Sequence, residues 1–256
     1  LLRSRPLQSP QPVVRSEGSY VYYIPQQFDR YYIDLQTTFE DYTLKFSSKT
    51  RSTIKRKIKK FSAQCEDSLH WESYKTADEI CQFFDLARLV SEKSYQEKLL
   101  DAGLPDNQSF RSSMIKLAEQ NLVRGYLLFD GKRPVAYMYC PENNGTLIYQ
   151  YLGYDPDYIK WSVGTILHWL AFEDIFSENC YKYFDFTEGQ SEHKRQYSTN
   201  SIFCGNVYIF PKSLATYALI SSHYFVEMVS KYLGNLAEKL GLKSKLKKII
   251  RFGGAK

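Results

Sequence analysis

The sequence contains no apolar run that could form a membrane-spanning helix. Such a helix needs roughly 18–20 consecutive apolar residues, and no stretch approaches this length. The sequence also lacks any Cys-x-x-Cys pair. It has five cysteines: Cys65, Cys81, Cys140, Cys180 and Cys204. Their odd number and isolation favour reduced thiols in the cytosol over disulfides or a zinc site. We therefore expect no metal centre.

Aromatic residues are abundant. The 256 residues include 22 Tyr and 16 Phe, and aromatics make up 16% of the chain. Hydrophobic residues contribute 43% and charged residues 24%, which is typical of a folded globular protein. The length allows one large domain or two small ones with a substantial core.

The positive charge is concentrated in two segments. Residues 45–60 carry eight Lys or Arg and no acid, and residues 239–256 carry seven and no acid. The net charge is +6, so the rest of the chain is negative. Each segment is either a solvated helix face or a surface for an anion, such as a phosphate-bearing cofactor, an acidic lipid or a nucleic acid. For residues 236–256 we expect a basic amphipathic helix, which can lie on an anionic membrane or pack one apolar stripe on the protein.

The sequence predicts one main domain over residues 19–235. Residues 1–18 are rich in Pro, Ser and Gln and are interpreted as a leader or linker. The first half of the domain, residues 19–122, is the more helical. Its predicted strands are 19–24, 31–35 and 70–74, and its predicted helices are 39–46, 48 onward, 77–100 and 109–121.

The second half, residues 123–210, contains an antiparallel meander. Strands 123–129, 134–140 and 146–153 are separated by the turns Asp130-Gly131 and Asn143-Asn144-Gly145, which are strong hairpin signals. A helix at 163–177 and a strand at 182–186 should complete a strand–helix–strand unit whose strands are parallel or splayed. A strand at 202–210 and a helix at 214–233 follow. The fold class is α+β.

The chemically informative stretch is residues 145–197. A strand ends at Gly153, and a loop with Ser162 and Gly164 leads into a helix. Free amides and the helix dipole at such a start favour phosphate, and Gly164 allows close approach of a ligand. Most strand–Gly–helix turns bind nothing, so the pattern alone leaves both interpretations open.

Four segments resemble the acetyltransferases related to cellulose-biosynthesis CelD proteins and to FemAB peptidyltransferases, a branch of the GNAT superfamily. They are YIDLQTTFEDYTLKFSSKTRSTIKRKIKKF, FDGKRPVAYMY, GYDPDYIKWSVGTIL and FDFTEGQSEHKRQYS, spread in order from Tyr31 to Phe210. Ser162-Val163-Gly164 replaces the usual Ser-Pro-Gly, which keeps the amides. The resemblance implies a GNAT-like mixed, mostly antiparallel sheet flanked by helices, with a splayed strand–helix–strand cofactor site.

The resemblance also implies the reaction. An acyl group would pass from acetyl-CoA or another acyl-CoA to an amine or hydroxyl of a sugar or of a cell-envelope or polysaccharide precursor. The pantetheine arm would follow Tyr149, Tyr151 and Gly153. The pyrophosphate would lie at the loop Lys160, Trp161, Ser162, Val163, Gly164 and Thr165. Basic residues of the first charged segment, Arg51, Lys55 and Arg56, would contact a phosphate of the acceptor.

Five residues are candidates for catalysis. By resemblance, Lys194 stabilises the acyl carbonyl and Tyr197 protonates the leaving thiolate. His193 suits proton transfer near neutral pH, Asp185 could be a base or could orient Lys194, and Glu188 is a weaker base. Each has an ordinary alternative: a surface lysine, one tyrosine among many, a bystander histidine, or an acid satisfied by backbone amides.

Two other functions stay open. One is a Fem-like transferase that uses aminoacyl-tRNA, although no coiled-coil arm is readable and we do not expect nucleic acid as a partner. The other is a non-catalytic module for anions or membranes with a degenerate pocket. The sequence leads us to expect a cytoplasmic protein or one that is peripheral on the inner face of the membrane.

Overall fold

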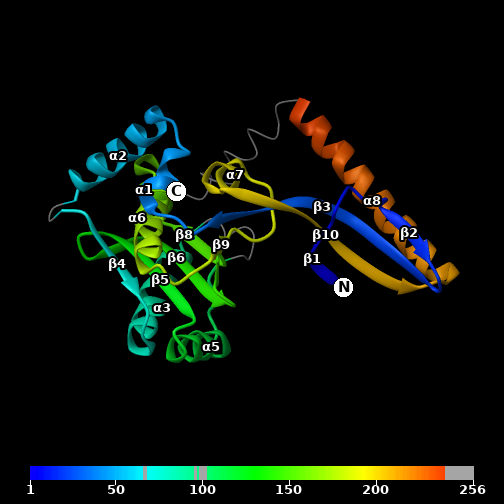
Figure 1. Cartoon of the computed structure of the whole chain (residues 1–256), viewed down its shortest axis with the longest axis horizontal. Coiled ribbons are helices and arrows are strands. Elements are labelled where there is room, and N and C mark those ends of the chain that lie inside the picture. The colour runs from blue at the N-terminus through cyan, green and yellow to red at the C-terminus, as the bar shows by residue number, and fades with distance from the viewer. Residues whose placement is uncertain (66–67, 95–96, 98–102, 240–256) are drawn as a thin grey trace. The chain divides into compact units, whose positions relative to one another are not determined.

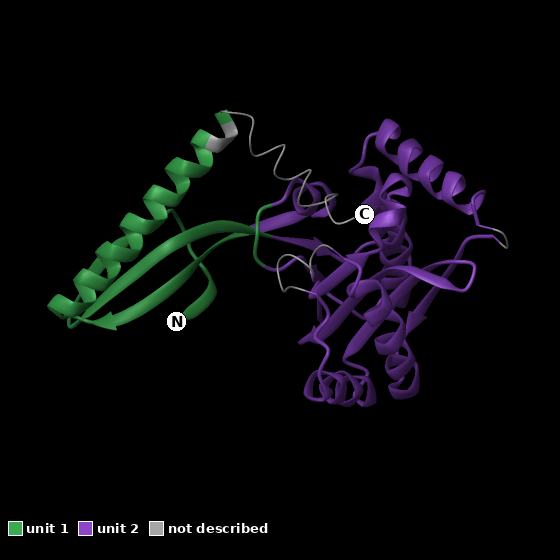
Figure 2. Ribbon diagram, turned by 180° about the vertical axis from the view of Figure 1, so that it is seen from behind, with its two compact units in different colours: residues 1–30, 188–190, 202–256 green, residues 31–187, 191–201 purple. Residues whose placement is uncertain are grey.

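The structure is a computed structural model of the chain (Figure 1), and it describes residues 1–65, 68–94, 97 and 103–239. The chain divides into two compact units, which Figure 2 shows in different colours. Unit 1 comprises residues 1–30, 188–190 and those from 202 onward, and unit 2 comprises residues 31–187 and 191–201. These units do not follow the expected boundaries, because segments far apart in the sequence pair with one another.

Unit 2 contains a mixed, mostly antiparallel sheet. Along the sheet the strands are β4 (His70–Tyr74), β5 (Val123–Asp130), β6 (Arg133–Asn143), β7 (Thr146–Ile148), β9 (Tyr183–Asp185) and the last residues of β3 (Tyr20–Asp34). The β7–β9 pair is parallel and the other neighbours are antiparallel. β8 (Tyr151–Tyr154) also pairs with β6. The α+β expectation is therefore confirmed, as is the parallel pair on either side of the helix.

The meander turns form where the sequence predicts them. Gly131 follows β5 with φ of +56°, and Asn144 and Gly145 follow β6 with φ of +52° and +78°. Glycine and asparagine tolerate this left-handed region better than other residues. The hairpins β5–β6 and β6–β7 are therefore encoded locally.

The strand predicted at 146–153 is interrupted by a bulge. Tyr139 lies opposite Tyr151, whereas Glu142 lies opposite Leu147, so one extra residue is inserted between β7 and β8. The extra residue falls at Tyr149 and Gln150. A bulge of this kind reverses the side-chain alternation and redirects the strand. β7 runs beside β9, and the β8 residues continue along β6.

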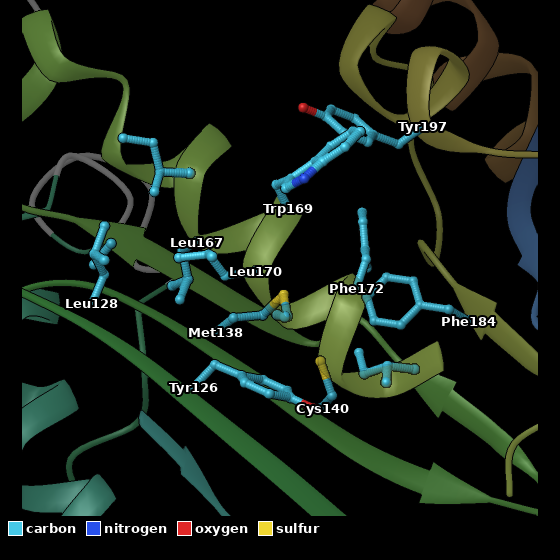
Figure 3. Packing of buried hydrophobic residues seen from close by; sticks show 14 of the residues in the cluster. Tyr126, Leu128, Met138, Cys140, Leu167, Trp169, Leu170, Phe172, Phe184 and Tyr197 are labelled. Atoms are coloured by element: carbon cyan, nitrogen blue, oxygen red, sulfur yellow. The ribbon is translucent and has the colours of Figure 1, made fainter. Parts of the chain in front are cut away.

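Helices cover both faces of the unit 2 sheet. They are α1 (Phe39–Leu44), α2 (Ser48–Ser62), α3 (Ala77–Ser91), α5 (Gln108–Glu119), α6 (Val163–Glu178) and α7 (Glu192–Tyr197), with a 3-10 helix η1 (Pro156–Trp161). Tyr126, Leu128 and Met138 join the core cluster of α1, α2 and α6, while their neighbours Leu127 and Tyr137 join that of α3 and α5. Figure 3 shows Leu167, Leu170 and Phe172 of α6 with the β6 side chains Met138 and Cys140.

Side chains cap the starts of several helices. α2 begins at Ser48, as expected, and Ser47 caps it: its hydroxyl accepts a hydrogen bond from the Thr50 N–H. Thr76 and Glu79 form a reciprocal capping box at α3. Such caps satisfy N–H groups that have no partner within the helix.

Unit 1 contains β1 (Leu2–Pro6), β2 (Val14–Glu17), most of β3, β10 (Asn200–Pro211) and α8 (Leu214–Lys239). β1 pairs with β10, and β2 pairs with β3, both antiparallel. Residues 1–18 are thus not a linker. Their sequence shows no strand periodicity, but β1 and β2 within them pair with β10 and β3. β3 runs unbroken through Pro25, where a turn was expected, because the fixed φ of proline suits extended chain.

The expected helix at 236–256 lies mostly outside the described residues, since the structure describes α8 only as far as Lys239. Over the part of the chain that the structure describes, no helix has both the length and the apolar character to cross a membrane. None of the five cysteines forms a disulfide.

Candidate active site

Two backbone amides at the start of α6 have no partner among the residues that the structure describes. Ser162 adopts a left-handed conformation, with φ of +58°, between η1 and α6, and its side chain does not cap the helix. The N–H groups of Thr165 and Ile166 bond to the Ser162 carbonyl. The first N–H groups of a helix have no partner within it, so those of Val163 and Gly164 are left for other acceptors. The turn can therefore hold an anion.

A groove of about 470 Å³ extends from Thr165, in the first turn of α6, to α7. It lies between α2, α6 and α7 and is lined by Lys49, Thr50, Thr53, Ile54, Lys57, Thr165, His193, Gln196 and Tyr197. Lys49 and Lys57 come from the basic helix α2, which packs against α6 and η1. Two cations and a helix N-terminus thus face one cavity, which favours an anionic ligand.

A second concavity, of about 710 Å³, lies at the other end of α6. Its lining includes Glu40, Asp41 and Glu173. Although this cavity is larger, carboxylates and a helix C-terminus repel polyanions. The smaller groove is the better candidate for a phosphate-bearing ligand.

Two histidines meet at the groove. The rings of His168 and His193 lie 4.6 Å apart, and the Nδ1 of His168 lies 2.7 Å from the Gly164 carbonyl oxygen. Since a carbonyl only accepts, Nδ1 carries the proton and Nε2 of His168 is an acceptor. Both Nε2 atoms are buried without a hydrogen-bond partner among the described residues. Such atoms are uncommon in folded proteins.

Burial keeps both imidazoles neutral. It lowers the pKa of His168 well below its usual value, and the neighbouring His193 lowers it further. Burial and then the charge of Lys194 lower the pKa of His193 to about 4. At neutral pH the His193 ring that lines the groove is therefore uncharged. It can accept a proton that a substrate releases during a reaction.

Tyr197 stands beside the histidines. Its ring stacks on that of His168, with centroids 5.8 Å apart. The Tyr197 side chain is buried and is part of the groove lining. Burial raises the pKa of Tyr197 to about 12. Tyr197 is thus a neutral hydrogen-bond donor at physiological pH.

The other predicted catalytic residues occupy different positions. Lys194 follows His193 and is not among the groove-lining residues of α7, but its charge lies close enough to lower the pKa of His193. The Asp185 carboxylate accepts a 2.8 Å hydrogen bond from the Thr187 N–H and holds the turn after β9. Glu188 belongs to unit 1, where Ser4 and Asn206 donate to its carboxylate.

The bulge separates the two tyrosines predicted to follow the cofactor arm. The Tyr149 ring packs 5.4 Å from that of His168, within the α6 cluster. The Tyr151 ring packs 5.6 Å from that of Phe110, within the α5 cluster on the other face. Regular alternation would place residues 149 and 151 on one face, and the extra residue cancels this. Of the two, Tyr149 lies on the face of the groove.

Packing explains two further positions. A Cβ at Gly153 would lie 2.3 Å from the Tyr137 ring, so this glycine makes room for a buried side chain. Trp161 packs 6.5 Å from Phe61 of α2, with the Lys60 and Lys160 ammonium groups over its ring. Neither residue is among those that line the groove.

Sequence reasoning proposed three basic residues of α2 for an acceptor phosphate and did not name the two lysines that line this groove. Lys55 and Arg56 are exposed, and the Arg51 guanidinium donates to the Thr43 carbonyl. The groove is lined instead by Lys49 and Lys57. The sequence contained a signal for these two lysines. They flank the buried Ile54 of α2 at helical spacing, so they lie near the element against which Ile54 packs.

No cluster of three or more His, Cys, Asp or Glu side chains placed to bind a metal occurs among the residues that the structure describes.

Comparisons with known proteins agree with this architecture. A model of the acetyltransferase (GNAT) domain matches residues 48–195, more than half of the chain and the stretch that builds the groove. No curated protein sequence matches the chain.

Solved structures resemble the chain at low sequence identity. The C-terminal domain (DUF2156) of a putative lysylphosphatidylglycerol synthetase from Agrobacterium fabrum is 10% identical with a TM-score of 0.53, and the match covers 81% of this chain and 66% of that one. The L-PGS from Bacillus licheniformis is 15% identical, with a TM-score of 0.47 and coverage of 80% and 66%. FemX is 9% identical, with a TM-score of 0.48 and coverage of 75% and 63%.

This chain therefore spans somewhat less than two thirds of the length of these proteins. At 10% identity and a TM-score of 0.53, the Agrobacterium fabrum match shows the fold alone, and the other two carry no argument. The family match, the mixed sheet and the helix start that opens into a cationic groove point to one conclusion. The chain belongs to the GNAT acetyltransferase domain family.

Proposed function

We propose that the protein transfers an acyl group from an acyl-CoA, acetyl-CoA foremost, to an amine or hydroxyl of its acceptor. One observation carries this proposal: the neutral His193 imidazole lines a groove with two lysines of α2 and with Thr165, in the first turn of α6. GNAT domains typically use acyl-CoA, and the chain belongs to that family. The non-catalytic alternative does not account for a buried, unpartnered imidazole nitrogen in the groove.

The donor is bound through its phosphates. Lys49 and Lys57 line the groove and supply positive charge, and the amides of Val163 and Gly164 directly precede Thr165, which also lines it. Hydrogen bonds from charged or oriented donors to phosphate are among the stronger contacts in proteins. The pantetheine arm then follows the Tyr149 side of the strand toward α7, since Tyr151 packs on the opposite face.

The reaction follows from the groups beside α7. The acceptor nitrogen or oxygen attacks the thioester carbonyl, a C–N or C–O bond forms, and the C–S bond breaks to release the CoA thiolate. The acceptor loses one proton, and within the proposal the neutral His193 imidazole, whose Nε2 has no hydrogen-bond partner among the described residues, takes it up. Within the proposal, Lys194 donates to the carbonyl oxygen as the family resemblance implies.

Tyr197 acts in this scheme as a hydrogen-bond donor. With a pKa of about 12, its hydroxyl is a weaker acid than a thiol, whose ordinary pKa is near 8.5. A full proton transfer to the thiolate would be uphill, whereas a hydrogen bond to the sulfur stabilises the leaving group. The thiolate then takes its proton from solvent or from His193.

The acceptor is proposed from the resemblance alone. The CelD-like and FemAB-related motifs favour a sugar or a precursor of the cell envelope or of a polysaccharide. The exposed Lys55 and Arg56 lie away from the groove lining and remain candidates for contact with such an acceptor.

Acyl-CoA binding tests the proposal. We expect acetyl-CoA to raise the melting temperature, and Lys49→Gln with Lys57→Gln to weaken its binding at least about tenfold, since each removes a charged contact to phosphate. The matched control is Lys55→Gln with Arg56→Gln, which removes the same charge from the exposed side of α2 and should leave binding unchanged. Isothermal titration calorimetry measures both variants.

Two results would contradict the proposal. If neither acetyl-CoA nor a longer acyl-CoA binds, the donor is wrong. If aminoacyl-tRNA binds instead, with a steep dependence on salt, the Fem-like donor replaces acyl-CoA.

A further inference from the structure

α8 in unit 1 uses one side to pack on the sheet. Ile220 is 4% exposed and joins Val21 and Tyr23 in a small core. The Tyr23 hydroxyl lies 2.7 Å from His223 Nδ1, and the Tyr217 hydroxyl lies 2.8 Å from the Ser16 hydroxyl. Figure 2 shows α8 lying along the strands of unit 1. These contacts fix which side of the helix faces the protein.

The opposite side of α8 is apolar and exposed. Phe225, Val229, Tyr232 and Leu236 recur at intervals of four, three and four residues, so they form one stripe along the helix. Their exposed fractions are 61%, 37%, 68% and 43%. Three large apolar side chains flank this stripe, and each is more than half exposed: Val226, Met228 and Leu233. We call these seven residues the outer stripe.

A contiguous apolar surface of this kind is unusual on a protein in water. Scattered exposed apolar residues need no explanation, but seven within twelve residues of one helix do. The surface is therefore expected to have an occupant.

The charge pattern favours an anionic bilayer as this occupant. Between residues 214 and 238 the sequence has two acids, Glu238 and Glu227, and Glu227 is 25% exposed and pairs with Lys231. The chain then continues with seven Lys or Arg and no acid over residues 239–256. Apolar side chains that enter the headgroup region, followed by a cluster of cations, match the two contributions by which peripheral helices bind anionic membranes.

A second copy of the chain is a poorer match. It would present the same excess of positive charge next to the same apolar surface, and like charges oppose association. Anionic lipids instead neutralise this charge. The tyrosine at position 232 also suits the bilayer interface, where its ring is buried and its hydroxyl stays in water.

We propose that the outer stripe of α8 is a membrane-docking surface that inserts into the headgroup region of bilayers rich in anionic lipid. This surface lies in unit 1 and is independent of the acyl-transfer groove in unit 2. It would hold the protein at a lipid surface without a membrane-spanning helix.

Vesicle sedimentation of the full chain tests this surface. We expect the protein to sediment with vesicles of phosphatidylcholine and phosphatidylglycerol, much less with phosphatidylcholine alone, and less as salt screens the charges. Replacing Phe225 and Tyr232 together by serine should lower the partition onto anionic vesicles roughly tenfold or more, because both side chains lose apolar contact with lipid. The melting temperature should not fall, since both side chains are exposed.

Leu44→Ser is the matched control. Leu44 is 68% exposed, as Tyr232 is, but it lies on α1 in unit 2. The control should bind vesicles like the unaltered protein. The proposal is overturned if the unaltered chain does not sediment with anionic vesicles, or if the double variant binds them equally well. It is also overturned if the double variant instead loses a self-associated state in analytical ultracentrifugation, since the occupant is then a second copy.

Discussion

At the scale of single residues, two glycines near the groove have opposite surroundings. A Cβ at Gly153 would lie 2.3 Å from the Tyr137 ring, which is fully buried and whose hydroxyl donates to Ser91. A Cβ at Gly164 would meet only Tyr154, at an ordinary 3.6 Å. Packing against Tyr137 therefore requires glycine at position 153. Packing does not require glycine at position 164, where a larger residue would fit.

This contrast gives a paired prediction. Gly153→Ala should lower the free energy of unfolding by about 1–3 kcal/mol, as overpacking does. Gly164→Ala should change it by less than about 0.5 kcal/mol, because alanine is favoured in helices, and should weaken acyl-CoA binding by crowding the phosphate. Urea denaturation and calorimetry measure the two effects. Equal binding by the Gly164→Ala variant and the unaltered protein would show that no ligand approaches this amide closely.

The buried histidines make stability depend on pH. A histidine that stays neutral in the folded state binds a proton only after unfolding, so stability is lost as pH falls from about 6.5, the ordinary histidine pKa. For His193 the loss continues down to its folded pKa of about 4. The pKa of His168 is lowered as well, for the same cause of burial.

We therefore predict that lowering the pH from 7 to 5 destabilises the protein, and that His168→Gln removes part of this loss. Glutamine does not titrate and keeps a donor for the Gly164 carbonyl. Denaturation curves at several pH values measure the difference in slope. An identical pH dependence in the variant would show that His168 is not held neutral.

At the scale of elements, α7 brings His193 and Tyr197 to the groove with only six residues, Glu192–Tyr197. Its start depends on Ser191, whose hydroxyl accepts from the Lys194 N–H at 3.3 Å. Its far end is held by Lys45, which donates to the Gln196 and Ser198 carbonyls. Such a short helix has little stability of its own, so its ends decide its position.

Loss of the Ser191 cap should therefore affect both stability and catalysis. We expect Ser191→Ala to lower the free energy of unfolding by about 0.5–2 kcal/mol and to lower kcat/KM, because His193 is held less firmly. Ser191→Asp should restore both, since aspartate is an equally good cap. Parallel denaturation and steady-state kinetics test this. Lower stability with unchanged kcat/KM would separate the cap from the site.

At the scale of the whole molecule, the buried clusters follow the two units. The two large clusters consist of residues between 31 and 201, and the small one consists of residues from unit 1. A domain folds alone when its core is complete within it. Unit 2 is nearly continuous in sequence, interrupted only by residues 188–190.

We predict that residues 31–201, expressed alone, fold cooperatively and bind acyl-CoA as the full chain does. Thermal melting followed by circular dichroism tests the folding, and calorimetry tests the binding. A broad, non-cooperative melt would show that unit 2 needs strands of unit 1.

Local sequence signals predicted much of this fold, and particular residues show why. Asp130-Gly131 and Asn144-Gly145 specify tight turns through their own conformational preferences, and the apolar run at 163–177 specifies a buried helix. The bulge at Tyr149 and Gln150 could not be predicted in this way. It depends on β7 lying beside β9, a strand more than thirty residues further on.

The same distinction applies to the candidate site. Sequence reasoning named His193, Tyr197 and the loop around Gly164, because these residues lie in recognisable motifs. It could not place Asp185 in a turn-capping role, Glu188 in unit 1 or Lys49 and Lys57 in the groove. Each of these depends on what a distant element presents.

By itself, then, the sequence determined the turns, the helix starts and the concentration of charge in α2, because hydrogen bonding and apolar periodicity act over a few residues. Only the tertiary structure decided which face of α2 meets the start of α6, and that His168 and His193 are buried together and stay neutral. Desolvation and proximity arise from segments far apart in the chain, and no local pattern contains them.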